Sequence, residues 1–369
     1  MKKITVLQII SELSDGGVEA MLMDIYRNID HSIINFIFVV QSDKRRYKDE
    51  ILELGGNIYQ IEPLHSIGVM AYIKKIISIC KIEHINIVHC HNLTQNPILL
   101  FAAKLAGVKM RISHSHLTTA FSRKTEIFMP FIRLGINCLA THRLACGNDA
   151  GRFLYGNKDF LVIRNAININ KFLYATPVNL KEELGITEKV NVLLHVGRLS
   201  EQKNHRYLID IMDKIRKQRQ DIILLCCGSG PNMNEIKEEI HEKGLEKQIL
   251  LLGSRTDIPG LMKSAKLLLL PSLYEGFPVT LVEAQASGLY AIVSDTIDKD
   301  SDLGINLVKF LPINTNVDEW VHEICKFVDN DSLKNNFSPE IIEKELEKQG
   351  YSSENNSKIL EEIYMSVLE

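Results

Sequence analysis

Short apolar runs alternate with longer segments of helical periodicity along nearly the whole chain. Apolar runs without polar alternation are typical of parallel strands that are covered by helices on both faces. The runs form two series, which predict an α/β protein with two doubly wound sheets. The predicted strands of the first series are Ile4–Ile10, Ile34–Val40, Asn57–Ile61, Ile85–His89, Met110–Ser113, Arg143–Cys146 and Phe160–Ile163. Those of the second series are Val190–Val196, Ile222–Cys227, Ile249–Leu252, Ala265–Pro271 and Ala291–Ser294.

The two series meet near Asn165, and a polar stretch with a proline follows at residues 175–179. A chain of 369 residues is long enough for two domains of about 100–200 residues each. We therefore expect one Rossmann-like domain at residues 1–166 and a second at residues 167–350. Residues 351–369 carry apolar side chains at helical spacing and predict a final helix that must bury its apolar stripe.

Composition places few limits on this picture, with 45% hydrophobic and 24% charged residues. No apolar run approaches the roughly 20 residues that span a bilayer. The short N-terminal run favours a first strand over a signal peptide, because no small-residue cleavage site follows it. The seven cysteines are scattered and form no C-x-x-C pair, which argues against a disulfide framework or zinc knuckle. We expect a cytoplasmic protein.

Charge is unevenly distributed, since residues 1–165 hold 20 Lys and Arg against 14 Asp and Glu, a balance of +6. The rest of the chain carries −9, and the total is −3. A basic half favours an anionic partner such as a membrane surface or a pyrophosphate, or it is simply a differently solvated surface. We expect no nucleic-acid partner. Residues 121–133 combine Arg123, Lys124 and Arg133 with aromatic side chains, which is typical of a membrane-surface helix or of a helix with core aromatics.

The most informative segment, residues 271–284, follows a predicted apolar strand. Gly276 and Pro278 predict a turn into a helix, whose N-terminus would offer backbone N–H groups and a positive dipole end to a diphosphate. Glu275 and Glu283 lie before and inside this helix, and carboxylates bind the vicinal hydroxyls of a sugar or a ribose well. The alternative is a capping residue and a solvated helix face.

A second segment, residues 196–204, follows the first predicted strand of the second series. Arg198 and Lys203 in this loop, after Gly197, would neutralise a pyrophosphate and the charge that grows on it as a glycosidic bond breaks. The alternative is a pair of surface cations. Gly228 and Gly230 form a weaker signal, either a plain turn or a place where backbone approaches a ligand.

In the first series, Gly16 and Gly17 open a predicted helix without completing a G-x-G-x-x-G fingerprint. His89 and His91 follow one predicted strand, and His114 and His116 follow another. These histidines could hold a metal, pack in loops, or contact a sugar or an acceptor, and His114 is the best placed for chemistry. No Asp-x-Asp motif lies in a suitable strand-end loop, so we expect no metal or other cofactor to be required.

The segment Glu275-Gly276-Phe277-Pro278 with Glu283 resembles the E-x7-E signature of family-4 glycosyltransferases. The segment Gly197-Arg198-Leu199 with Lys203 resembles the diphosphate-binding segment of that family. Gly16-Gly17, His114 and Asn165 also fall where the family has a glycine-rich loop, a histidine and a domain-junction asparagine. Through Gly16-Gly17-Val18-Glu19, residues 26–30 and His114-Ser115-His116, the chain is similar to the EpsF-like enzymes of bacterial exopolysaccharide and capsule synthesis.

This resemblance implies a GT-B fold, in which two Rossmann-like domains face each other across a cleft and the last helix returns to the first domain. The first domain would bind the acceptor and the second a nucleotide-sugar donor, commonly UDP-linked. The acceptor would be a lipid-linked saccharide or an oligosaccharide at an anionic membrane. The transfer would retain the anomeric configuration without a metal ion. Two alternatives stay open: a sugar-nucleotide epimerase or hydrolase of the same fold, and a non-catalytic sugar-nucleotide-binding subunit.

The resemblance also implies roles for single residues. Glu275 would contact the donor sugar, Glu283 the ribose, and Arg198 and Lys203 the pyrophosphate, while His114 would lie near the reacting carbon. His91 and His116 would contact the acceptor. The full set of residues expected to bind the donor is Gly16, Gly17, Gly197, Arg198, Lys203, Gly228, Gly230, Arg255, Glu275, Gly276, Phe277, Pro278, Val279, Thr280 and Glu283.

Overall fold

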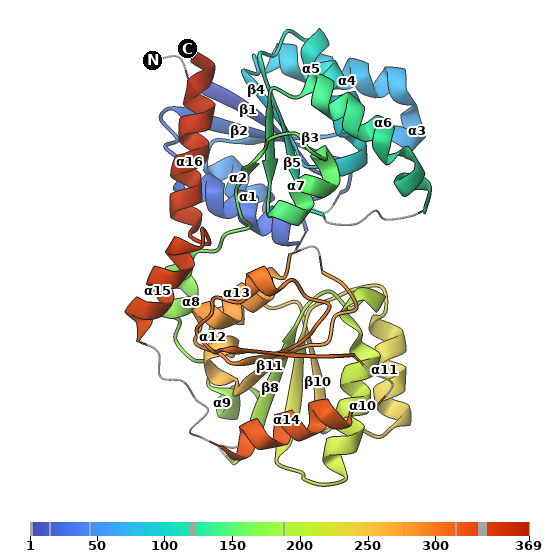
Figure 1. The fold of residues 1–369 in the computed structure, drawn as a ribbon, viewed down its shortest axis with the longest axis vertical. Helices are drawn as coiled ribbons and strands as arrows, with labels where there is room; N and C mark the ends of the chain where they lie inside the picture. Colours follow the sequence, from blue (N-terminus) through green and yellow to red (C-terminus); the bar gives the residue numbers. More distant parts are fainter. Residues whose placement is uncertain are drawn as a thin grey trace. The chain divides into compact units, whose positions relative to one another are not determined.

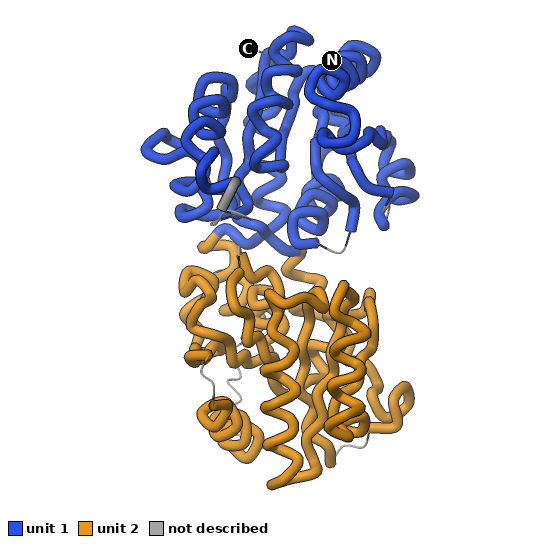
Figure 2. Tube along the Cα trace, turned by 90° about the vertical axis from the view of Figure 1, so that its right-hand side faces the viewer, with its two compact units in different colours: residues 1–167, 350–369 blue, residues 168–349 orange. Residues whose placement is uncertain are grey.

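The structure is a computed structural model, and it describes residues 3–14, 16–43, 46–117, 123–186, 189–275, 277–313, 316–330 and 338–368. The chain forms two compact units (Figures 1 and 2). Unit 1 comprises residues 1–167 and 350–369, and unit 2 comprises residues 168–349. The first unit is therefore built from both ends of the chain.

Unit 1 contains a seven-stranded sheet in the order β3-β2-β1-β4-β5-β6-β7, in which every pair of neighbours is parallel. The central strands are almost fully buried, as their apolar sequences require. The strands are β1 (Ile4–Ile9), β2 (Ile34–Val40), β3 (Asn57–Gln60), β4 (Ile87–Cys90), β5 (Met110–Ser115), β6 (His142–Ala145) and β7 (Leu161–Val162).

Helices flank this sheet, and the last helix of the chain belongs to unit 1 (Figure 1). Helix α16 (Ser353–Met365) packs against α1 (Gly17–Asn28) and buries Leu360 and Tyr364 in the same core as β1 and β2. The other helices of unit 1 are α2 (Lys48–Glu53), α3 (Leu64–Ile67), α4 (Val69–Ile82), η1 (Leu93–Gln95), α5 (Asn96–Leu105), α6 (Arg123–Leu139), α7 (Asn148–Tyr155) and η5 (Ser366–Leu368).

Unit 2 contains a six-stranded, fully parallel sheet in the order β10-β9-β8-β11-β12-β13. Its strands are β8 (Asn191–Val196), β9 (Ile222–Cys227), β10 (Ile249–Gly253), β11 (Leu267–Leu270), β12 (Ala291–Ser294) and β13 (Val308–Leu311). Its helices are α8 (Ile169–Leu173), α9 (Leu180–Leu184), η2 (Glu201–Lys203), α10 (His205–Arg216), α11 (Met233–Glu242), α12 (Ile258–Ser264), α13 (Val279–Ala286), η3 (Lys299–Ser301), α14 (Asp318–Asp329) and α15 (Pro339–Lys348).

The predicted fold class, an α/β protein with two doubly wound parallel sheets, is confirmed. The strand β13 was absent from the sequence prediction. Its sequence Val308-Lys309-Phe310-Leu311 is interrupted by a lysine and lies at the edge of the sheet, so it lacks the continuous apolar run that identified the other strands.

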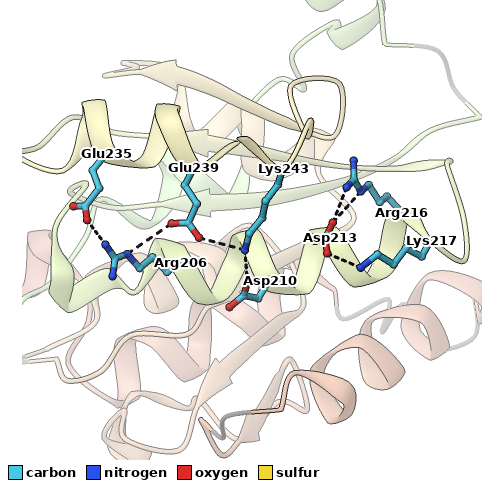
Figure 3. Close-up of polar contacts among 8 residues, drawn as sticks. All are labelled: Arg206, Asp210, Asp213, Arg216, Lys217, Glu235, Glu239 and Lys243. Atoms are coloured by element: carbon cyan, nitrogen blue, oxygen red, sulfur yellow. Dashed lines mark hydrogen bonds and ion pairs between the residues drawn. The ribbon is translucent and has the colours of Figure 1, made fainter. Parts of the chain in front are cut away.

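An ion-pair ladder joins α10 to α11 on the surface of unit 2 (Figure 3). Arg206 pairs with Glu235 and Glu239, and the Nζ of Lys243 lies 2.6 Å from a carboxylate oxygen of Asp210. Exposed pairs of this kind typically contribute about 0–1 kcal/mol each. The packed apolar faces of these helices, including Ile211 and Ile236, therefore account for most of the stability of this layer.

Candidate active site

Both sheets have a topological switch point, where successive connections leave in opposite directions. In unit 2 the chain runs from β8 outward to β9 and β10, and then crosses to β11 on the other side of β8. In unit 1 the switch point lies between β1 and β4. Ligands of open α/β sheets bind beyond the carboxyl ends of the strands at these points. The loops that follow β8, β11, β1 and β4 are therefore the places to look for a site.

In unit 2 the loops after β8 and β11 meet through an ion pair. The Nζ of Lys203 lies 2.6 Å from Oε1 of Glu275, and the two side chains are only 15% and 6% exposed. The amide of Gln202 donates to Oε2 of Glu275 at 3.2 Å and to the carbonyl of Tyr274 at 3.0 Å. Both carboxylate oxygens of Glu275 are therefore hydrogen-bonded, and the structure brings together two residues predicted for the donor site.

Glycines in these loops allow backbone and side chains to pass closely. The aliphatic part of the Lys203 side chain packs over Gly197. A Cβ at Gly197 would lie only 3.1 Å from the Cε of Lys203. Gly228 has a φ of +142°, and a Cβ there would collide with the carbonyl oxygen of Gly197. A Cβ at Gly230 would collide with the backbone of Leu199. Gly228 and Gly230 therefore pack the loop after β9 against the loop that carries Lys203, a role that sequence alone did not distinguish from ligand contact.

The helix α13 begins at Val279, directly after the loop that carries Glu275. Pro278 is its N-cap residue and provides no side-chain hydrogen bond. The side chain of the N-cap residue therefore does not occupy the positive end of the helix dipole, where the predicted diphosphate would bind. Phe277 precedes Pro278, Thr280 lies in the first turn, and the half-buried Glu283 lies farther along the helix. Gly276 lies outside the described residues.

Two predicted cations differ in their surroundings. Arg198 is exposed at the start of the loop after β8. Arg255, after β10, donates twice to the carboxylate of Asp257, at 2.8 and 2.5 Å, and also pairs with Glu183. The guanidinium of Arg255 is therefore already held by carboxylates, and β10 lies two strands away from β8. The structure does not bring Arg255 together with Lys203.

In unit 1 the four histidines of the two H-x-H segments form one cluster. His89 lies at the end of β4 and His114 lies on β5, which is the neighbouring strand, while His91 and His116 lie just beyond. The Nε2 of His89 lies 3.2 Å from Nδ1 of His114, and Nδ1 of His91 lies 2.9 Å from Nε2 of His116. The rings also lie against each other, with centroids 4.3 Å apart for His89 and His91.

Burial is the main influence on these rings. It lowers the pKa of His89, His91 and His114 well below the usual value, and neighbouring rings lower it further. For His114 the backbone of Ile163 acts in the opposite direction. The pKa of His116 falls to about 4 through burial, although a hydrogen bond with Asn165 opposes this. The cluster is therefore neutral near pH 7.

Three partners of the cluster were not predicted as part of it. Gln8 on β1 and Tyr364 on α16 hydrogen-bond to His91 and His89, and Oδ1 of Asn165 lies 3.1 Å from Nδ1 of His116. Gln8 is a polar residue inside an otherwise apolar strand, which is a detectable signal. Tyr364 was assigned only to the apolar stripe of the last helix. Asn165 was assigned to the domain junction.

The histidine cluster also has the composition of a cation site. Among the described residues, His89, His91 and His114 bring candidate ligand atoms within 4.8 Å of one another. However, both ring nitrogens of His89 and of His91 already have hydrogen-bond partners. A cation bound here would have to displace these bonds, so the arrangement fits a hydrogen-bonded network better than a metal centre. The expectation that no metal is required stays a prediction.

Gly16 and Gly17 lie at the start of α1, as predicted, with Gly16 as the N-cap residue. Gly16 has an extended φ of −79°, so its backbone does not itself require glycine. A Cβ at Gly16 would instead meet the carboxylate of Glu19, which folds back over the N-terminus of the helix. The loop after β1 therefore places a carboxylate near these glycines.

The helix α6 exposes a row of apolar side chains. Ile127, Phe128, Phe131 and Leu134 are 71%, 58%, 71% and 63% exposed, so these aromatics do not lie in the core. Arg133 is held inward, since its Nε donates to the carbonyl of Phe153 at 2.9 Å. Phe121 and the side chains of Arg123 and Lys124 lie outside the described residues. Among the described helices, none is long and apolar enough to span a bilayer.

Comparison with known proteins identifies the family. Residues 179–344 match the family model described as glycosyl transferases group 1. The chain is 33% identical over 371 residues to the protein named as glycosyltransferase EpsF in Bacillus subtilis (strain 168), with 97% of this chain and 96% of that protein covered. It is 29% identical over 285 residues to the UDP-Gal:alpha-D-GlcNAc-diphosphoundecaprenol alpha-1,3-galactosyltransferase of Escherichia coli, covering 73% of each.

The fold is also that of a solved structure. The glycosyltransferase of Rickettsia africae superimposes with a TM-score of 0.81 over 100% of both chains, at 17% sequence identity. At this identity the likeness shows the fold alone, which is the two-domain GT-B fold expected from the sequence. The nearly complete alignment with EpsF at 33% identity establishes more. This chain belongs to the group 1 glycosyltransferases, among the EpsF-like enzymes of exopolysaccharide synthesis.

Proposed function

We propose that this glycosyltransferase transfers a sugar from a UDP-sugar to a lipid-linked saccharide, with retention of anomeric configuration, in exopolysaccharide or capsule synthesis. The observation that carries the proposal is the buried Lys203–Glu275 pair at the switch point of unit 2, directly before the N-terminus of α13. A cation, a carboxylate and a helix N-terminus are the three groups that a sugar diphosphate needs.

In this proposal, binding of the donor separates Lys203 from Glu275. The ammonium group of Lys203 then binds the diphosphate, and the exposed Arg198 adds a second positive charge. Glu275 then accepts hydrogen bonds from the hydroxyls of the sugar, and Glu283 accepts those of the ribose. In this exchange the charge of Lys203 stays paired with an anion, and the carboxylate of Glu275 gains hydroxyl donors in place of the ammonium group.

The same cations would assist bond cleavage. As the bond between the sugar and the diphosphate breaks, negative charge grows on the departing phosphate, and Lys203 and Arg198 stabilise it. The acceptor hydroxyl attacks from the side on which the phosphate leaves, and that phosphate takes the hydroxyl proton. This route uses no enzyme nucleophile and retains the configuration at the sugar carbon. His114 would contact the donor sugar near that carbon.

The acceptor is proposed from the relative in E. coli, whose name specifies a diphosphoundecaprenol acceptor and UDP-Gal. A lipid-linked acceptor requires the enzyme to reach a membrane surface. The exposed Ile127, Phe128, Phe131 and Leu134 of α6 provide an apolar face for insertion into the headgroup region. The positive balance of residues 1–165 adds attraction to anionic lipids.

The test is a two-step assay on the purified full chain. Nucleotide sugars are first screened for thermal stabilisation, because a ligand at 100 times its Kd adds about 2.7 kcal/mol to the stability. The best donor is then incubated with a polyprenyl-diphosphate saccharide in anionic vesicles, and the anomeric configuration of the product is measured by NMR. We expect transfer with retention. An inverted product would overturn the mechanism, and release of free sugar without transfer would overturn the transferase assignment.

A further inference from the structure

Two carboxamides, those of Gln41 and Gln95, lie side by side in the loops after β2 and β4, outside the histidine cluster. The Nε2 of Gln41 donates to Oε1 of Gln95 at 2.6 Å, and the two amides also bond to the hydroxyl of Tyr72, at 2.8 and 3.1 Å. Tyr72 on α4 is fully buried, and burial raises the pKa of its hydroxyl to about 12. The hydroxyl therefore keeps its proton near pH 7, and the whole group is neutral.

The outer side of this amide pair has the same chemistry whichever way the amides are turned. In the structure, Oε1 of Gln41 and Nε2 of Gln95 have no hydrogen-bond partner among the described residues, and both side chains are partly exposed. Turning both amides by half a turn keeps every bond and exchanges the two open ends. Turning only one would set two nitrogens or two oxygens against each other. In either allowed arrangement, the pair offers one open acceptor and one open donor.

The amide pair lies beside the switch point of unit 1. The backbone N–H of Gln41 donates to the carbonyl of Ser11 at 2.9 Å, and the hydroxyl of Ser11 donates to Oδ1 of Asn92 at 3.1 Å. The loops after β1, β2 and β4 are thus joined at the edge where open α/β sheets bind their ligands. Strand β2 is three strands from β5, which carries His114, or about 14 Å at the usual strand spacing. Gln41 therefore lies on the side of the switch point away from His114.

The loop after β4 holds Gln95 in a conformation that is costly for the chain. Leu93 has a φ of +27°, which is unfavourable for residues other than glycine. One end of the Asn92 amide is shielded from solvent without a partner in the described part of the chain, and turning the amide would only place its other atom there. The buried Asn96 fixes this loop, because its Oδ1 accepts from the backbone N–H of Asn92 at 3.0 Å. Such a loop is typical of a binding site that is shaped before its ligand arrives.

We propose that Gln41 and Gln95 form a subsite that binds two hydroxyl groups of the acceptor saccharide. One hydroxyl of a sugar accepts from the open N–H of one amide, while another hydroxyl donates to the open oxygen of the other amide. A phosphate or a carboxylate would use only the donor. The proposal rests on the proposed function, in which His114 contacts the donor sugar. Because Gln41 lies three strands away from His114, the acceptor fits this subsite better than the donor does.

A titration followed by NMR tests the subsite directly. The side-chain NH2 groups of glutamine are labelled with 15N in the full chain, and their signals are assigned from Gln41→Met, Gln95→Met and Gln349→Met. The probes are neutral methyl glycosides and disaccharides, with inorganic phosphate and UDP for comparison. We expect at least one saccharide to shift the signals of Gln41 and Gln95, but not that of Gln349, a partly exposed amide that donates to a backbone carbonyl in unit 2. No shift with any saccharide, or an equal shift with phosphate or UDP, would overturn the proposal.

Transfer kinetics provide the second readout. Gln41→Met and Gln95→Met remove the amide but keep an unbranched side chain of similar length. Each is expected to raise KM for the polyprenyl-diphosphate saccharide about tenfold, because a hydrogen bond to the acceptor is lost. The values of kcat and of KM for the nucleotide sugar should stay within about twofold, since the amides would bind only the acceptor. Gln349→Met is the matched control and should leave all three constants unchanged.

The outcomes separate this proposal from the proposed function. Transfer with an unchanged KM for the acceptor in both folded variants would overturn the subsite. A rise in KM for the nucleotide sugar alone would show that the amides bind the donor, which also contradicts the proposal. A wild type that transfers no sugar would refute the proposed function, whereas the NMR titration would still decide whether Gln41 and Gln95 bind a saccharide.

Discussion

The two switch points of this chain share a topology but differ in their chemistry. In unit 2 the loops meet through a charged pair, Lys203 and Glu275, with a nitrogen–oxygen distance of 2.6 Å. In unit 1 the strand ends meet through four histidines that burial keeps neutral. A diphosphate is bound best by side chains that are permanently cationic at neutral pH. A sugar hydroxyl is bound by a neutral hydrogen-bond donor or acceptor with a fixed orientation. In the proposed function, unit 2 would therefore bind the charged part of the donor, and unit 1 would contact hydroxyls.

Removing charge from the switch point of unit 2 should have the largest effect. Lys203→Ala and Arg198→Ala are each expected to lower kcat by on the order of 10²–10³, because a preorganised charge on the departing diphosphate is lost. The rate is measured as UDP release in the presence of acceptor. Lys243→Ala in the surface ladder is the control, since Lys243 also pairs with a carboxylate but lies at the end of α11. Near-normal turnover in both site variants would refute the assignment.

Acid should lower the folding stability of the chain through the histidine cluster of unit 1. The pKa of His116 is lowered in the folded chain, from 6.5 to about 4, so the unfolded chain binds more protons between these two values. Stability therefore falls as the pH drops from about 6.5 to about 4, by on the order of 3 kcal/mol for this ring alone. His195 and His205 in unit 2, whose pKa values are also lowered, contribute with the same sign.

Urea unfolding at a series of pH values from neutral to about 4 measures this slope. His116→Gln should flatten it, because a glutamine does not titrate. His65→Gln replaces an exposed histidine and should leave the slope of the wild type unchanged. An identical pH dependence in the wild type and His116→Gln would mean that His116 does not titrate differently in the folded and unfolded chains.

A third prediction concerns the exposed face of α6. The double change Phe128→Ser and Phe131→Ser should weaken binding to anionic vesicles about tenfold or more, since each aromatic side chain that leaves the interface loses on the order of 1–2 kcal/mol. Cosedimentation at low salt measures the binding. Ile341→Ser on α15 removes an exposed apolar side chain from unit 2 and is expected to have no effect. If all three proteins cosediment equally, α6 does not contact lipid.

The smallest expected effect is that of chelation. Lys203, Arg198 and the N-terminus of α13 would neutralise the diphosphate without a cation, so EDTA should leave the transfer rate within about twofold of its starting value. The rate is measured before and after dialysis against EDTA. Loss of activity with recovery on adding Mn²⁺ or Mg²⁺ would show that a metal ion neutralises the donor.

The fold could be predicted from the sequence because each strand is marked by a short apolar run of neighbouring residues. The strands were identified from short apolar runs, and among the described strands only β13, with a lysine inside an edge strand, was missed. Lys203, Glu275 and the four histidines were also named from the sequence, and the structure places them at the two switch points. The pairing of Lys203 with Glu275 was not predicted, because the two residues are 72 positions apart and each was assigned to the ligand instead. From sequence each residue was predicted to contact the ligand, whereas in the folded chain the two residues contact each other.

The histidine cluster shows the same limit more clearly. The two H-x-H segments could be recognised, but two of their hydrogen-bond partners, Gln8 and Tyr364, lie at opposite ends of the chain. A polar residue in an apolar strand signals that a partner exists without indicating which residue it is. Only the packing of α16 against α1 identifies that partner.

The contribution of α16 to unit 1 has a consequence for how the chain folds during synthesis. Gln8 and Tyr364 are separated by 356 positions. The ribosome therefore releases all of unit 2 before the residues that complete unit 1 emerge, and contacts of such long sequence separation form slowly. Unit 2 should reach its native state first. Until α16 is made, the apolar surface of unit 1 that α16 covers stays exposed to solvent. Removing residues 353–368 should make the newly made protein a substrate for chaperones and proteases, even though every strand of both sheets is still present.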